Sequence, residues 1–449
     1  MSNFRLVDRD TGFLLPPSVD EWLPKRHLAR FVVEVIEGLD LRAMIGSYRG
    51  SGEAAYHPTI LLGLLVYGYA TGVFSSRKLE RATYDSVAFR FIAANQHPDH
   101  DTIAAFRRRF LAQIEALFVQ VLLLAREAGL LKLGTVALDG TKIQADASRH
   151  SALSWEHAQK IEAQLRAEVA ELMALAEAAD QADVPDGMSV PEELARREDR
   201  LARIAAAKAA IEARAAERLA RERAEHAAKL AAREAKAKQT GRKPGGRPPA
   251  AGPGPSDQVN LTDAESRIMP VAGGGFEQAY NAQAAVATGS LLVVAGDVVQ
   301  AANDKQQITP MLARLGRLPE ALGKPRTLLA DSGYFSEANV EACAAARIAP
   351  LIAPGRERHH RCWRERFAAA PPPPDDPPPL DAMMHCLATP EGRQTYALRK
   401  QTPEPVFCII KSVMGFRQFS LRGLDKVRGE WNLVTMAWNF KRMFALGYA

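Results

Sequence analysis

The chain has 449 residues, of which 47% are hydrophobic and 24% are charged, a composition that predicts a globular protein of two or three domains. Its four cysteines lie far apart and form no CxxC pair, which excludes a disulfide scaffold and favours a reducing cytoplasm. The net charge is +6, and the segment from Lys400 to Ala449 holds eight Lys or Arg against three acids. This local surplus favours a polyanionic partner.

Residues 1–130 are predicted to form a helical N-terminal domain. The first ten residues carry charges where a signal peptide needs an apolar run, so we expect no export. The uncharged stretch from His57 to Ser76 contains several glycines and tyrosines and is flanked by polar helical patterns. These features favour a buried core helix over a membrane span.

A long helix is predicted from Ile103 to Gly129, with Asp101 or Thr102 as its N-cap and the glycine as its C-terminal stop. Arg107 and Arg108 near its start indicate a helix-turn-helix-like element that faces DNA. The alternative is a solvated charged face on a helical bundle.

The middle of the chain changes pattern twice. Residues 131–150 contain a short apolar, β-branched run that predicts a first strand. Residues 151–240 are rich in Ala, Arg and Glu and predict two long helices, a helical hairpin or coiled-coil arm for packing or dimerisation. Residues 241–258 are rich in Pro and Gly and predict a flexible, disordered linker.

Residues 259–449 predict the remainder of a mixed sheet with helices on both faces. The expected strands are 280–288, 291–300, 326–330 and 348–352; the expected helices are 305–317, 336–347, one from Pro405 and 431–444; and 355–395 is an irregular excursion. Right-handed crossovers place the later strands parallel beside an antiparallel hairpin. The predicted fold class is therefore α+β, with a long helical hairpin inserted after the first strand.

Three acids fall where such a fold gathers ligands. Asp139 and Asp331 follow apolar strands, and Glu404 opens a helix. Two carboxylates about 4 Å apart repel by roughly 4 kcal/mol at an effective dielectric near 20, so a cluster needs cations. Two Mg²⁺ ions, with Mn²⁺ as a substitute, would activate a water or hydroxyl and stabilise the leaving oxygen of a phosphodiester.

Each acid also has a structural interpretation. An aspartate after a strand is usually a turn or cap residue, and Glu404 can interact with a helix dipole. Asp146 and Asp304 could join the site, but a solvated strand end and a helix cap are the preferred roles for them.

Three segments resemble a known family. VALDGTKIQADAS around Asp139, TLLADSGYFSEANV around Asp331 and TYALRKQTPEPVFCIIKSVMG around Glu404 resemble the DDE transposases of bacterial insertion sequences, close to insertion-sequence family eleven-eighty-two. The resemblance implies a ribonuclease-H-like fold in which these three acids form a metal-binding catalytic triad.

The resemblance extends to a tyrosine–arginine–glutamate–lysine signature. Tyr396, Arg399, Glu404 and Lys411 match it, although four residues separate Arg399 from Glu404 where the commoner form has three. Lys411 stands two helical turns after Glu404, which predicts that both face one phosphate backbone.

The resemblance also implies the partners. Double-stranded DNA of the element ends and of the target would bind a phosphate-contacting surface, and the protein would act as a homodimer in the bacterial cytoplasm, at the nucleoid, without a membrane. Further members of this surface would be Arg417, Arg422, Lys426 and Lys441.

Several alternatives stay open. They are an inactive DNA-binding relative, a ribonuclease-H-like nuclease without strand transfer, and a scaffold built on the helical arm. A phosphatase is excluded because Ala137 stands where its aspartate nucleophile would be. Irregular spacing argues against a zinc site at His359, His360, Cys362, His385 and Cys386.

Overall fold

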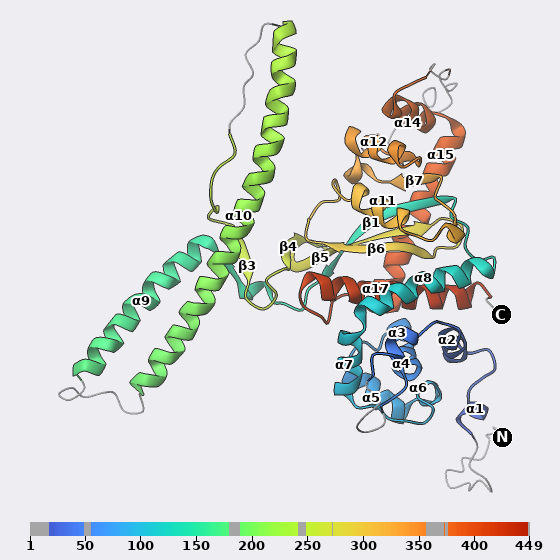
Figure 1. Cartoon of the computed structure of the whole chain (residues 1–449), viewed down its shortest axis with the longest axis horizontal. Coiled ribbons are helices and arrows are strands. Elements are labelled where there is room, and N and C mark those ends of the chain that lie inside the picture. The colour runs from blue at the N-terminus through green and yellow to red at the C-terminus, as the bar shows by residue number, and fades with distance from the viewer. Residues whose placement is uncertain are drawn as a thin grey trace, which may run out of the picture. The chain divides into compact units, whose positions relative to one another are not determined.

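The computed structural model divides the chain into two compact units, Met1–Ile143 with Asn281–Ala449, and Gln144–Tyr280 (Figure 1). It describes residues 18–48, 55–178, 189–240, 248–271, 273–355, 372 and 376–447. The two units are described separately below.

The first unit begins with the predicted helices. Their bounds are α1 (Val19–Trp22), α2 (Leu28–Glu37), α3 (Arg42–Ile45), α4 (Pro58–Thr71), α5 (Ser76–Asp85), α6 (Val87–Ile92), α7 (His100–Arg109) and α8 (Leu111–Glu127). The apolar helix α4 is buried along nearly its whole length, begins with proline at its first turn and ends at Gly72 in the left-handed conformation. It is a core helix, as predicted.

The helix predicted from Ile103 to Gly129 is in fact two helices. The chain breaks at Phe110, which ends α7 and begins α8 and is itself buried. The N-cap of α7 is Asp99, whose carboxylate accepts a hydrogen bond from the Thr102 amide, and not Asp101 or Thr102. The predicted stop at Gly129 is correct, since this residue has a φ of +73°.

No single helix in the described ranges is long and apolar enough to cross a membrane. Helices α4 and α5 meet the criteria of length and composition only as a pair, and their axes are bent by 96°.

A mixed sheet forms the centre of the first unit. Its strands are β1 (Thr135–Gln144), β5 (Phe276–Ala287), β6 (Val293–Val299), β7 (Thr327–Ala330) and β8 (Ala349–Ile352). They lie in the order β6-β5-β1-β7-β8, with β7 parallel to both β1 and β8 and with β6 antiparallel to β5. The chain enters at the central strand, forms an antiparallel hairpin on one side and adds parallel strands on the other. This is the ribonuclease-H-like arrangement.

Helices flank this sheet. Helix α17 (Leu424–Ala445) packs on β6 and against α8 and α4. Helices α11 (Ile308–Gly316) and α12 (Glu337–Ala345) pack on each other, α11 also against β6 and α12 also against β8. The tryptophans of α17 secure it, since Trp431 donates to the Gln283 carbonyl and Trp438 to the Leu291 carbonyl. Both indoles are buried.

The excursion predicted at 355–395 is partly helical. Helices α14 (Pro379–Ala388) and α15 (Pro390–Ala397) each start with a proline in the first turn, which is where helices tolerate it. Met383 of α14 is buried, and α14 packs against α12 and β8. His359, His360 and Cys362 lie outside the described residues.

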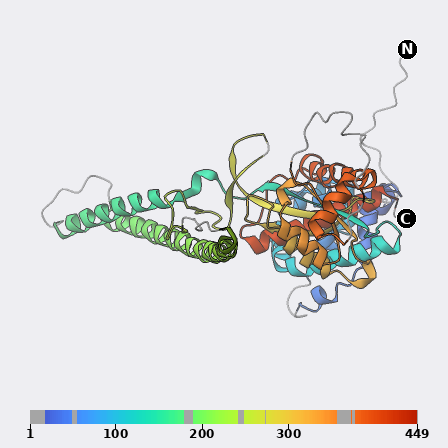
Figure 2. The ribbon, with the colours of Figure 1, turned by 90° about the horizontal axis from the view of Figure 1, so that it is seen from above.

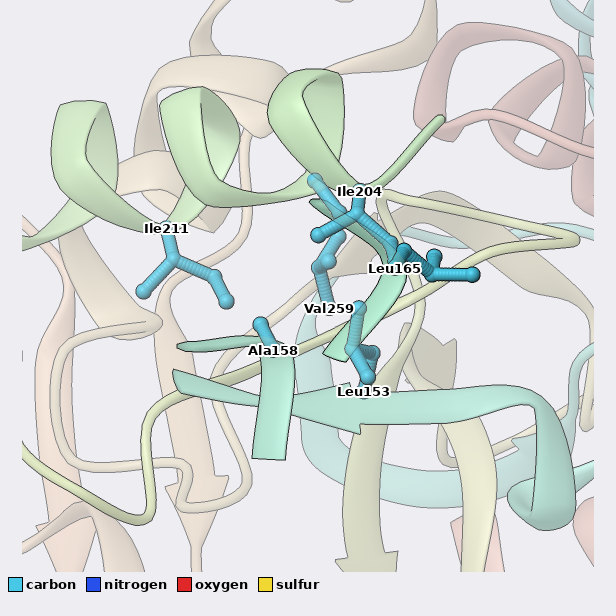
Figure 3. Close-up of a cluster of buried hydrophobic side chains, with 7 residues drawn as sticks. Leu153, Ala158, Leu165, Ile204, Ile211 and Val259 are labelled. Atoms are coloured by element: carbon cyan, nitrogen blue, oxygen red, sulfur yellow. The ribbon is translucent and has the colours of Figure 1, made fainter. Parts of the chain in front are cut away.

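The second unit contains the predicted helical hairpin, formed by α9 (Trp155–Ala178) and α10 (Val190–Thr240), which run side by side (Figure 2). The short strands β2 (Ala152–Ser154) and β3 (Gln258–Asn260) pair at its base, and β4 (Arg267–Pro270) pairs with the start of β5. Figure 3 shows the core of this unit, which consists of Leu153, Ala158, Leu165, Ile204, Ala207, Ile211 and Val259.

The apolar residues of α10 recur every three or four positions, which places them on one helix face toward α9. Two ion pairs join the helices beside this face: Lys208 with Glu162, at 2.7 Å, and Arg197 with Glu168, at 2.8 Å.

The linker predicted at 241–258 is anchored where it is described. Asp257 forms two hydrogen bonds of 2.8 Å with Arg218 of α10, and its carbonyl accepts from the Trp155 amide. The prediction of disorder is therefore wrong for residues 248–258, because turn contacts that composition does not reveal fix them. Residues 241–247 lie outside the described residues.

Candidate active site

Asp139 lies on β1, and Asp331 directly follows the neighbouring strand β7. The parallel register of β1 and β7 pairs Thr135 with Thr327 and Ala137 with Leu329. Continued by two residues, this register places Asp139 opposite Asp331, directly after the last residue of β7. Neighbouring strands are about 4.8 Å apart, and opposite residues point to the same face, so the two side chains share one neighbourhood.

The electrostatics of Asp139 agree with this register. Burial raises the pKa of this carboxyl to about 7, and the negative charges of Asp331 and Asp304 contribute to the rise. A hydrogen bond of 2.8 Å from the Gly140 amide and the positive charge of Arg399 act in the opposite direction. Asp139 is therefore a carboxyl group that lacks sufficient counter-charge.

Glu404 is connected to this pair through Arg399. It lies in the first turn of α16 (Pro403–Cys408), and its Oε1 is 3.3 Å from Nη2 of Arg399. The Arg399 side chain is only 13% exposed, and its Nε is buried without a hydrogen-bond partner. The additional residue between Arg399 and Glu404 is accommodated by a 3₁₀ turn, Leu398–Gln401, followed by Thr402, so the ion pair forms despite the longer spacing.

Tyr396 and Lys411 both contact the strands that carry the aspartates. The Tyr396 hydroxyl is 3.4 Å from the Ala330 carbonyl, one residue before Asp331. The Lys411 ammonium donates to the Lys142 carbonyl of β1 at 2.8 Å.

The shared face predicted for Glu404 and Lys411 assumed an uninterrupted α-helix. Instead the chain forms a π-helix over Ile409–Val413, which changes the direction of side chains after Glu404. Lys411 is half-buried and turned toward β1, and burial lowers its pKa.

Asp304 does not cap a helix, contrary to prediction, because α11 begins four residues later at Ile308 without a side-chain cap. Its Oδ1 accepts hydrogen bonds from the side-chain amides of Asn281, at 2.7 Å, and Gln283, at 2.6 Å. Its Oδ2 is 3.8 Å from the Lys142 ammonium. Asp146, the other aspartate considered, belongs to the second unit.

Sequence reasoning missed Lys142, Asn281, Gln283 and Tyr334. The Tyr334 hydroxyl donates to Gln283 Oε1, which fixes the orientation of that amide. The available signal was the pair of amides in the otherwise apolar strand YNAQAAVA, since polar side chains buried in a strand require specific partners.

The other residues that were predicted to contact DNA differ in their exposure to solvent. Arg417, Arg422, Lys426 and Arg108 are exposed. Lys441 is partly buried and donates to the Ala70 carbonyl at the end of α4.

Arg107 is 7% exposed, so it does not lie on a DNA-facing surface. Its guanidinium donates to the Tyr69 hydroxyl at 2.9 Å, and that hydroxyl donates to Glu430 of α17 at 2.8 Å. The arginine was mispredicted because a charged helical face and a buried ion network have the same local sequence.

The carboxylates are suited to a hard cation. Among the residues that the structure describes, no three Asp, Glu, His or Cys side chains are grouped closely enough to hold a metal ion by themselves. Asp139 and Asp331 nevertheless provide the one or two carboxylates with which proteins hold Mg²⁺ when substrate phosphates complete its shell. The raised pKa of Asp139 is consistent with a site whose ionised form a cation would stabilise.

Three family models match separate parts of the chain. Residues 17–109 match a transposase domain (DUF772), and residues 253–372 and 379–444 each match a transposase DDE domain. No curated protein and no solved structure matches the chain. The matches together cover more than half of the sequence and include the N-terminal helices, Asp331 and Glu404, and the family uses divalent metal ions. With its ribonuclease-H-like sheet, the chain belongs to the DDE transposases of insertion sequences.

Proposed function

We propose that this protein binds the ends of its insertion sequence, cleaves the DNA there and joins the freed 3′-hydroxyl to target DNA. The observation that carries the proposal is the parallel register of β1 and β7. Continued by two residues, it brings Asp139, within β1, opposite Asp331, the residue after β7, although the two acids are 192 positions apart in the chain. A purely structural sheet gains nothing from burying a carboxyl group whose pKa is raised to about 7.

Each residue of the site has a proposed role. Asp139 and Asp331 hold the divalent cation, and Glu404 completes the acidic triad. Arg399 keeps Glu404 in place and supplies positive charge beside Asp139. Lys411 joins the helix that carries Glu404 to β1, through the Lys142 carbonyl.

Two Mg²⁺ ions, when bound, would supply Lewis-acid activation of the attacking oxygen and stabilisation of the leaving oxygen. The exposed basic residues Arg417, Arg422 and Lys426 would contact DNA phosphates outside the triad. We further propose that the protein acts as a homodimer on DNA in the bacterial cytoplasm, and that it is close to insertion-sequence family eleven-eighty-two.

The test is cleavage of a duplex that contains the sequence flanking the reading frame, in the presence of Mg²⁺. We expect the single changes Asp139→Ala, Asp331→Ala and Glu404→Ala each to abolish cleavage while DNA binding persists, because binding depends on the basic residues. Retention of cleavage by all three variants would contradict the proposal.

The same reaction separates the rival functions. Joined products in addition to nicked products indicate strand transfer, whereas nicks alone indicate a nuclease. A wild-type protein that binds the duplex and yields neither product would be an inactive relative.

A further inference from the structure

Lys142 is a mostly buried lysine to which the acidic triad assigns no role. It lies on β1, three residues after Asp139, and its side chain is only 16% exposed. Burial lowers the pKa of Lys142, but the negative charges of Asp304, Asp139 and Asp331 oppose that shift. The lysine is therefore the cation of β1 that interacts with the acids of the site.

The hydrogen bonds that Asp304 accepts orient its carboxylate toward Lys142. Both hydrogen bonds from Asn281 and Gln283 reach Oδ1, which leaves Oδ2 toward the ammonium, 3.8 Å away. Asn281 Oδ1 is also buried and has no hydrogen-bond donor, so a second acceptor is present in the same cluster.

The backbone is adapted to the same cluster. A Cβ atom at Gly140 would lie 2.2 Å from Gln283 Nε2 and 2.5 Å from Asp304 Oδ1. Any side chain at this position would displace these groups, so β1 approaches the cluster closely only because residue 140 is glycine.

Lys142 also belongs to a group of positive charges. Its carbonyl accepts a hydrogen bond of 2.8 Å from the Lys411 ammonium, and burial, together with the charges of Lys142 and Arg417, lowers the pKa of Lys411. The acids of the site repel a DNA phosphate, and cations next to them are needed to offset this repulsion.

We propose that Lys142 binds a phosphate of the DNA strand in the active site and that Asp304 is the residue that positions its ammonium. This inference rests on the proposed function, because it assigns Lys142 and Asp304 to the same DNA-cleaving site. Neither residue belongs to the triad or to its tyrosine–arginine–glutamate–lysine signature.

The first experiment measures DNA affinity against salt concentration in EDTA, so that neither metal nor cleavage contributes. Each lost phosphate contact makes the log–log slope shallower by about 0.9. We expect this change in Lys142→Met and its reversal in Lys142→Arg. The matched control is Lys324→Met, which removes an exposed lysine. Lys324 precedes β7, whereas Asp331 follows β7, so the two residues flank opposite ends of the strand. An unchanged slope in Lys142→Met would overturn the phosphate contact.

The second experiment tests positioning with a double-mutant cycle. If Asp304 acts through Lys142, then Lys142→Met should weaken DNA binding less in an Asp304→Asn background than in the wild type. Equal losses in both backgrounds would overturn the role of Asp304. If Lys142→Met does not fold, Lys142→Gln, which also removes the positive charge but keeps a polar side chain, gives the same comparison.

The two proposals can fail separately. A protein whose slope depends on Lys142 but which cleaves no DNA would contradict the proposed reaction and leave the phosphate contact intact. If the wild type cleaves DNA but Lys142→Met leaves the slope unchanged, the phosphate contact is contradicted and the proposed reaction stands.

Discussion

Asp139 combines two energetic costs at one residue, burial of a carboxyl group and proximity to other acids. Both costs apply to its ionised form, and together they raise its pKa to about 7 from a reference value of 3.8. A cation relieves both. The residue is thus a source of instability in the metal-free protein and a source of affinity for metal.

The direction of the Asp139 pKa shift predicts how the stability of the protein depends on pH. Because the pKa is higher in the folded than in the unfolded chain, the folded chain binds more protons, and the free energy of unfolding falls as pH rises from about 4 to about 7. Asp139→Asn has no such charge. In metal-free buffer the variant should match the wild type near pH 4 and exceed its stability near pH 8, by at most about 4 kcal/mol.

Denaturant titrations of both proteins across this pH range measure the difference, and added Mg²⁺ should reduce it by stabilising the wild type. A constant difference in stability at all pH values would contradict the assignment.

Arg107 and Arg108 are adjacent in sequence but occupy opposite environments. Arg107→Met would leave Glu430, which is fully buried, without its nearby positive charge, and should lower the free energy of unfolding by about 3–5 kcal/mol. Arg108→Met, at an exposed position, should change it by less than about 0.5 kcal/mol. Equal effects, measured by chemical denaturation, would show that Arg107 is not part of a buried network.

At the scale of elements, the sequence was sufficient for β1, β5, β6, β7 and β8 and for the long helical hairpin, because alternation and apolar spacing are local signals, but it did not predict the short strands β2, β3 and β4. The sequence was insufficient where contacts between distant segments determine the local structure. The break at Phe110 depends on burial of that ring, and the anchoring of Asp257 depends on Arg218, 39 residues earlier. Motifs identified the three acids. Lys142 was missed and Asp304 was assigned to a helix cap, because their roles arise from pairing between segments distant in the chain.

The close approach of β1 to β5 can be tested with two glycines. Gly140→Ala would place a methyl group 2.2 Å from Gln283 Nε2, so it should destabilise the protein by about 1–3 kcal/mol and reduce DNA cleavage. Gly289→Ala, between β5 and β6, meets nothing within 4 Å and should change stability by less than about 1 kcal/mol. Thermal unfolding and the cleavage assay measure both effects, and a harmless Gly140→Ala would refute the described contact.

At the scale of the whole molecule, the two compact units are linked through strands. The chain passes from one to the other after Ile143 in β1 and after Tyr280 in β5, so both connections lie within regular structure. Each unit nevertheless has its own apolar core, that of the second unit being the cluster around Ile204 and Ile211. Separate cores predict separate local stabilities.

Native-state hydrogen exchange can measure this separation. Ile211→Ala creates a cavity in the core of the second unit and should cost about 2–5 kcal/mol there, which speeds amide exchange in α9 and α10. Arg107→Met should speed exchange in α4 and α17 instead, because its guanidinium joins Tyr69 of α4 to Glu430 of α17. In the double variant the two effects should add to within about 0.5 kcal/mol, since the sites share no partner. Faster exchange in α17 after Ile211→Ala alone would instead mean that the inserted helical hairpin and the catalytic sheet unfold as one cooperative structure.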